Sequence, residues 1–324
     1  METHQKTQNG PASPAENRAV DTPPDSVRQT IQNADLSTLA LLSGRRVPFY
    51  LDDQGTVLLN PNRGVSPHRV FLCTIPKSGS YLFGALLEAM GLTRAGIAIT
   101  MNGFGDRRFA TKNELISADR SQKIGIPAQD AVSLIGCGQF AHGQIDCNWA
   151  MHQYLRDTKV VFTYRDLRDV LVSHMRWVAR SYKGTSSTNE WRDMDDSSEK
   201  FLAYLNDIGR DFLLSKCYPV IGWFFHSNTL SVSFERIYGD YGREEQLAAI
   251  GQIADYCGAS LTRQTAISVL KSTIGVQTFT WSGARSSWKS VWSAEADEFF
   301  ISLGAREINS LLGYSSSEED LGNI

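Results

Sequence analysis

The sequence predicts an α/β protein in which a parallel sheet is flanked by helices. Three short apolar segments have the composition of buried parallel strands, namely residues 69–75, 159–164 and 230–234. Segments with helical composition alternate with them, at residues 81–90, 169–180, 199–214, 244–257 and 294–312. Strands that alternate with helices form parallel sheets, and ligands bind beyond the carboxyl ends of such strands. The turns that follow residues 75 and 164 are therefore the first candidates for a functional site.

The length and composition predict one domain with two tails. A chain of 324 residues that is 42% hydrophobic can bury a sizeable core. Residues 1–35 and 315–324 are polar, and we expect the first segment to be disordered and the second to form a C-terminal tail. Residues 36–314 are left as the single folded domain.

Charge, cysteine content and hydropathy limit the partners and the location of the protein. The net charge is −3 and the isoelectric point is near 6.1, so no global basic field favours a nucleic-acid partner. The five cysteines are scattered, which is typical of reduced cytoplasmic thiols and argues against a metal site. The sequence has no secretory signal and no run of about 18 apolar residues. We expect a cytoplasmic protein without a membrane partner, and the oligomeric state stays open.

The segment FLCTIPKSGSYLF, residues 71–83, predicts a phosphate-binding loop. An apolar strand runs into a turn of small residues with one lysine, and a helix follows. Gly79 lets the backbone approach a ligand closely, and the start of the helix attracts an anion. Lys77 adds a positive charge, while Ser78 and Ser80 add hydroxyl donors. The alternative is an ordinary turn with a surface lysine, and the residue order of a Walker A loop is absent.

The segment KVVFTYRDLRDVLVSHMRW, residues 159–177, predicts a second anion site. It again reads as a strand, a charged turn and a helix. Arg165 stands at the end of the strand with its planar fork of donors, and Ser173 lies in the following helix with a hydroxyl. If the chain folds back as a strand–helix unit, both side chains can reach one phosphate. The alternative is that Arg165 and Asp166 only cap or pair at the start of the helix.

The two segments together resemble the cofactor-binding motifs of cytosolic and bacterial sulfotransferases, over about residues 66–314. PKSGSYL resembles the 5′-phosphosulfate loop of that family, with Ser80 in place of the usual threonine and Leu82 where many members carry tryptophan. RDLRDVLVS resembles the 3′-phosphate motif. The resemblance implies a P-loop-like fold and an enzyme that uses 3′-phosphoadenosine-5′-phosphosulfate (PAPS) and releases the desulfated nucleotide PAP. The implied cofactor-binding residues are Lys77, Ser78, Gly79, Ser80, Tyr81, Arg165 and Ser173.

A base and a last nucleotide-binding loop complete the resemblance. His142 follows a short apolar segment, as a general base near neutral pKa can do, and matches the position of the catalytic histidine of the family. His174 is the main competing histidine. TFTWSGARSSWKSVW, residues 278–292, resembles the C-terminal nucleotide-binding loop, which implies that Gly283 and Arg285 bind the 3′-phosphate. Lys77 and His142 are the implied catalytic residues.

These observations predict a PAPS-dependent sulfotransferase that modifies a small molecule, with a natural product of secondary metabolism as the expected acceptor. The accepting atom is a hydroxyl oxygen or an amine or amide nitrogen. Four aromatic residues are expected to line the acceptor pocket: Tyr182, Trp191, Trp223 and Phe225. The competing interpretations are a P-loop-type nucleotide-dependent phosphotransferase and a sulfotransferase that acts on macromolecules.

Overall fold

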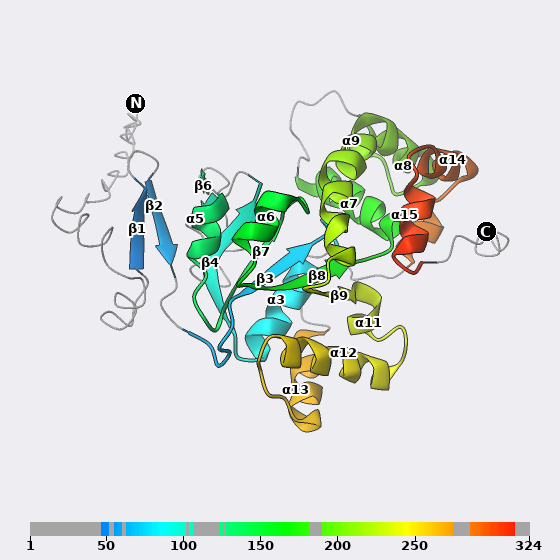
Figure 1. Ribbon diagram of the computed structural model, residues 1–324. Helices are drawn as coiled ribbons and strands as arrows, with labels where there is room; N and C mark the ends of the chain where they lie inside the picture. The colour runs from blue at the N-terminus through cyan, green and yellow to red at the C-terminus, as the bar shows by residue number, and fades with distance from the viewer. Residues whose placement is uncertain are drawn as a thin grey trace, which may run out of the picture.

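The computed structural model describes residues 47–51, 55–59, 63–101, 104–106, 123–125, 128–181, 190–274 and 286–314. A seven-stranded sheet with the order β6-β5-β4-β7-β3-β8-β9 lies at the centre of the molecule (Figure 1). Its strands are β3 (Val70–Thr74), β4 (Thr93–Thr100), β5 (Phe104–Asp106), β6 (Lys123–Gly125), β7 (Gln139–Gln144), β8 (Lys159–Tyr164) and β9 (Thr229–Ser233). The pairs β4–β7, β7–β3, β3–β8 and β8–β9 are parallel, and β5 and β6 are antiparallel additions at one edge. A separate antiparallel hairpin is formed by β1 (Val47–Leu51) and β2 (Gly55–Leu59).

Helices cover both faces of the sheet and bury two hydrophobic cores. Phe71 and Cys73 of β3 face one core, and Val70 and Leu72 face the other, as the alternation of a strand requires. The first core is covered by α5 (Ala128–Ser133), α6 (Trp149–Tyr154), α7 (Leu167–Ser181) and α8 (Ser198–Tyr204). The second is covered by α3 (Ser80–Ala89), α11 (Phe234–Tyr238), α12 (Arg243–Tyr256) and α13 (Arg263–Thr273). The central strands are therefore buried on both sides, which explains their continuous apolar sequences.

The remaining helical segments pack at the α7 side of the molecule. Short α-helical and π-helical turns continue from α8, namely η4 (Leu205–Gly209), α9 (Arg210–Phe212), η5 (Leu213–Cys217) and α10 (Tyr218–Ile221). They are followed by the 3₁₀ turn η6 (Gly222–Phe225), and further 3₁₀ turns are η3 (Glu190–Asp193) and η7 (Ser287–Ser290). The last two helices are α14 (Ala294–Ser302) and α15 (Ala305–Leu311).

The predicted α/β architecture is confirmed, with one difference among the helices. The three predicted strands are β3, β8 and β9, and His142 lies within a further strand, β7. The single helix expected over residues 294–312 is instead two helices, because Gly304 adopts a left-handed conformation with φ 68° between them. The predicted tails at residues 1–35 and 315–324 lie outside the described residues.

Two further expectations can be compared with the described part of the chain. All five cysteines lie within the described residues and are free of disulfide bonds there. Among the described helices, none combines the length and the apolar composition that a membrane crossing needs.

Candidate functional site

The loop between β3 and α3 has the backbone of an anion-binding turn. Lys77 and Gly79 both have left-handed conformations, with φ 69° and 91°. A lysine with positive φ is uncommon, and such strained residues gather at functional sites. Gly79 is required here, because a Cβ atom would also lie 2.7 Å from the Phe234 ring. Gly79 precedes α3, so the positive end of this ten-residue helix opens at the loop.

Ser78 supports the loop rather than offering its side chain to a ligand. Its hydroxyl lies 2.6 Å from the carbonyl oxygen of Ile75 and 2.9 Å from that of Thr163, and the residue is 0% exposed. The Ser78 N–H also donates to the Ile75 carbonyl. The expected hydroxyl donor of Ser78 is therefore used to tie the loop to β8. Ser80 is half-buried in the first turn of α3, and Tyr81 beside it is exposed.

Lys77 brings a positive charge with a lowered pKa to the loop. Its ammonium lies 5.3 Å from the ring centroid of Trp177 on α7. Burial, together with the positive charges of Arg180 and Arg165, lowers the pKa of Lys77 to about 8. The lysine can therefore gain interaction energy when an anion enters, because the anion would restore the preference for the charged form.

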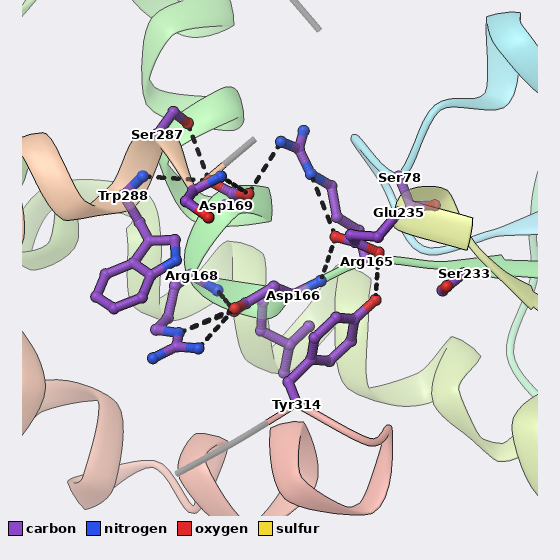
Figure 2. Close-up of polar contacts among 12 residues, drawn as sticks. Ser78, Arg165, Asp166, Arg168, Asp169, Ser233, Glu235, Ser287, Trp288 and Tyr314 are labelled. Carbon is purple, nitrogen blue, oxygen red and sulfur yellow. Dashed lines mark hydrogen bonds and ion pairs between the residues drawn. The ribbon is translucent and has the colours of Figure 1, made fainter. Parts of the chain in front are cut away.

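Arg165 lies at the carboxyl end of β8, the strand next to β3, and is only 5% exposed. Its Nη2 atom donates to Asp169 Oδ2 at 3.0 Å, and its Nε atom lies 3.9 Å from Glu235 Oε1 (Figure 2). The guanidinium carbon is 4.7 Å from the ring centroid of Phe234, the same ring that faces Gly79. The structure thus brings the two predicted anion-binding turns together at one edge of the sheet.

Ser173 lies on the face of α7 that contacts Arg165 and Lys77. It is half-buried and lies one helical turn beyond Asp169 and one turn before Trp177. Asp169 binds Arg165, and Trp177 contacts Lys77. The hydroxyl of Ser173 is consequently carried on the same helix face as the partners of both cationic residues.

The two candidate bases lie on different faces of the sheet. His142 pairs in register with Leu72, so its side chain lies on the α3 side. His174 comes from α7 on the opposite side, where its Nδ1 lies 2.8 Å from the Tyr204 hydroxyl and its ring stacks on Phe212 at 3.5 Å. Burial, reinforced by the charge of Lys77, lowers the pKa of His174 to about 3. This environment makes His174 a weak base.

Two buried carboxylates at the site were not identified as site residues from the sequence. Asp169 accepts hydrogen bonds from Arg165 and from the segment that begins at Ser286. Glu235 accepts a hydrogen bond from the Tyr314 hydroxyl at 2.6 Å (Figure 2). Burial is the main reason that the pKa of Glu235 is raised to about 7. Asp169 lies within the segment that resembles the 3′-phosphate motif, and Glu235 directly follows the predicted strand 230–234, but the partners Ser286 and Tyr314 lie far away in the chain.

The expected acceptor pocket is not supported by the positions of its tryptophans. Trp223 is 1% exposed and donates from Nε1 to the Ile145 carbonyl at 2.9 Å. Trp191 is also buried, and its Nε1 donates to Asp207 Oδ2 at 2.9 Å. Both are core residues, because a large indole is most stable when buried with its N–H satisfied.

Of the other residues predicted for the site, one is exposed and three are not described by the structure. Phe225 is 60% exposed, which leaves it available to a ligand or to solvent. Tyr182, Gly283 and Arg285 lie outside the described residues. Ser286, which follows Arg285 in the sequence, is the first described residue after that loop and has φ 48°.

The structure defines an α/β protein in which the two turns predicted to bind anions lie at the ends of adjacent parallel strands. Its fold is that of the sulfotransferases. Mouse sulfotransferase SULT7A1, complexed with PAP, superposes with a TM-score of 0.50 at 15% identity, over 78% of this chain and 91% of the mouse chain. Retinol dehydratase complexed with androsterone and PAP gives a TM-score of 0.47 at 15% identity, over 86% and 93% of the two chains. No protein-family model and no curated protein matches the sequence.

Proposed function

We propose that this protein is a PAPS-dependent sulfotransferase that transfers a sulfuryl group to a small molecule and releases PAP. The observation that carries the proposal is the convergence of the Lys77 loop and Arg165 on adjacent strands of a sulfotransferase fold. The donor set suits a nucleotide with two separated anionic groups. A strained glycine loop at a helix start fits the 5′ end, and a buried guanidinium fits the 3′-phosphate.

We assign the binding roles to residues of the two turns and of the last loop. Lys77, Ser80 and the loop around Gly79 would hold the 5′-phosphosulfate, with Tyr81 at the rim. Arg165 and Ser173 would hold the 3′-phosphate, and we assign Gly283 and Arg285 to the same phosphate on the family resemblance. Ser78 contributes by keeping the loop attached to β8. When bound, PAPS supplies the activated sulfuryl group.

The chemical roles are assigned to Lys77 and His142. The Lys77 ammonium would neutralise negative charge that develops as the phosphate–sulfate bond breaks, which is where a preorganised cation helps most. His142 would accept the proton of the attacking hydroxyl or amine. We prefer His142 to His174, because the buried imidazole of His174 is held by Tyr204 and has a pKa of about 3.

The acceptor is proposed to be a small molecule, in the cytoplasm, with an oxygen or nitrogen nucleophile. Of the aromatic residues considered for its pocket, we retain Tyr182 and Phe225. A natural product of secondary metabolism remains our proposal for its class. Trp191 and Trp223 are left out, because both are buried with their indole N–H groups already bonded.

The proposal is tested by incubating the protein with PAPS and a panel of phenols, alcohols and amines, and by measuring PAP and sulfated product. We expect acceptor-dependent PAP release, a loss of about a hundredfold or more in kcat for Lys77→Ala, and a similar loss for His142→Asn. His174→Asn should have the smaller effect. Phosphate transfer from ATP with magnesium, without any PAPS reaction, would instead identify a phosphotransferase.

A further inference from the structure

Asp169 lies between the proposed phosphate-binding arginine and the segment that follows the last loop. It is 2% exposed and stands in the first turn of α7. Its Oδ2 atom accepts from Arg165 Nη2 at 3.0 Å and from the Ser286 N–H at 3.0 Å (Figure 2). Its Oδ1 atom accepts from the Ser287 hydroxyl at 2.9 Å and from the Trp288 N–H at 3.1 Å. Each oxygen of this buried carboxylate therefore accepts two hydrogen bonds.

The guanidinium of Arg165 is held in a fixed orientation by three neighbouring side chains. Asp169 fixes Nη2, the Glu235 carboxylate lies near Nε, and the guanidinium plane is packed by Phe234. A buried arginine held on three sides loses little conformational freedom when a ligand arrives. The guanidinium of Arg165 is therefore held in one orientation.

The segment from Ser286 to Trp288 is held by the same turn of α7. Ser286 adopts a left-handed conformation, which a serine keeps only when its surroundings compensate the strain, and Asp169 accepts its N–H. The buried Trp288 ring lies 3.8 Å from the guanidinium carbon of Arg168. Arg168 in turn donates to both oxygens of Asp166.

We propose that Asp169 is a positioning residue of the nucleotide site, which orients Arg165 toward the 3′-phosphate and fixes the Ser286–Trp288 segment against the first turn of α7. This inference rests on the proposed function. A carboxylate close to a phosphate would normally repel it, so its presence needs a reason. The four hydrogen bonds supply that reason, because donors from both sides of the site stabilise the negative charge of Asp169.

The test compares PAP with adenosine 5′-phosphate, which lacks the 3′-phosphate, in calorimetric and competition titrations of wild type and Asp169→Asn. The asparagine keeps one acceptor oxygen, so it cannot accept from all four donors: either the Arg165 and Ser286 pair or the Ser287 and Trp288 pair loses its acceptor. We expect about tenfold weaker PAP binding and less than about twofold change for adenosine 5′-phosphate. A general loss of structure would weaken both nucleotides equally and would overturn the inference.

A double-mutant cycle separates action through Arg165 from an independent effect. In the Arg165→Ala background, Asp169→Asn should change PAP affinity by less than about twofold. Asp196→Asn is the control, because Asp196 also accepts from an arginine of α7, Arg176, which has no role in the proposed nucleotide site. It should leave PAP binding unchanged. An undiminished tenfold effect in the Arg165→Ala background would contradict the positioning role.

A milder variant keeps the test valid if Asp169→Asn does not fold. Ser287→Ala removes one donor to Asp169 without leaving a buried side-chain charge unpaired, and we expect PAP binding to weaken about threefold. Unchanged PAP binding in folded Ser287→Ala and Asp169→Asn would refute the inference while leaving the proposed function intact. Wild type that binds no PAP would instead refute the proposed function.

Discussion

Individual residues determine the charge at the proposed nucleotide site. Lys77 and Arg165 are near enough for the charge of Arg165 to help lower the pKa of Lys77. Arg165 lies beside the carboxylates of Asp169 and Glu235. Lys77 instead contacts the ring of Trp177, and its pKa is lowered to about 8. The lysine is therefore the group through which binding should depend most strongly on pH.

The first prediction concerns the pH dependence of PAP binding. Lys77 is charged below pH 8 and loses its proton above that value, whereas a bound anion favours the charged form. PAP affinity should fall by up to about tenfold for each pH unit above 8. Lys77→Arg, which stays charged, should bind with an affinity that is constant between about pH 7 and 9.5. Equal pH profiles for the two proteins in calorimetric titrations would contradict the role of Lys77.

The second prediction concerns Glu235 and stability. Its pKa is raised to about 7 by burial, above the usual value of 4.5, so protonation favours the folded state. The stability that this shift provides is complete below pH 4.5 and is lost as the pH rises through 7. Wild type should lose about 1–3 kcal/mol relative to Glu235→Gln between about pH 5 and 8 in urea unfolding. A constant difference between the two proteins over this range would show that Glu235 stays ionised.

At the scale of elements, the site depends on how one loop and one helix are built. The loop between β3 and α3 contains two left-handed residues, and the first turn of α7 carries Asp166, Arg168 and Asp169. These two elements come from strands that are neighbours in the sheet. A change in the loop backbone should therefore damage binding more than a similar change elsewhere.

The third prediction compares two glycine substitutions. Gly79→Ala places a Cβ on a residue with φ 91° and 2.7 Å from the Phe234 ring, so it should cost at least about 1–2 kcal/mol and abolish PAP binding. Gly251→Ala is the control, because it lies in α12 with nothing within 4 Å of the new atom. It should be neutral or stabilise by about 0.5–1 kcal/mol. Normal PAP binding by Gly79→Ala would show that the loop does not approach the nucleotide.

The sequence predicted these elements well where their signals are local. The strands β3 and β8 and the helices after them are apolar runs bounded by charged turns, so both the elements and Lys77 and Arg165 could be located. The break at Gly304 was missed, because a glycine inside a helical pattern does not by itself end a helix. The burial of Trp191 and Trp223 could not be predicted, because the residue type alone suits a core as well as a ligand site.

At the scale of the whole molecule, the sheet order brings the two motifs together. β3 lies between β7 and β8, so the chain places the proposed base, the lysine loop and the arginine turn on three adjacent strands. The contacts of Asp169 with Ser286 and of Glu235 with Tyr314 close the site from distant parts of the chain. Such long-range pairs have no local pattern, which is why the sequence alone did not identify these two acids as site residues.

The central claim is that Arg165 and the Lys77 loop form one PAP site, and calorimetric titration with PAP tests it most directly. Wild type should bind PAP, and Arg165→Ala should bind at least about thirtyfold more weakly while keeping its circular dichroism spectrum. Arg156→Ala, which removes an exposed arginine beside Asp157, should bind like wild type. Folded wild type that binds no PAP, or Arg165→Ala that binds it equally well, would contradict the account.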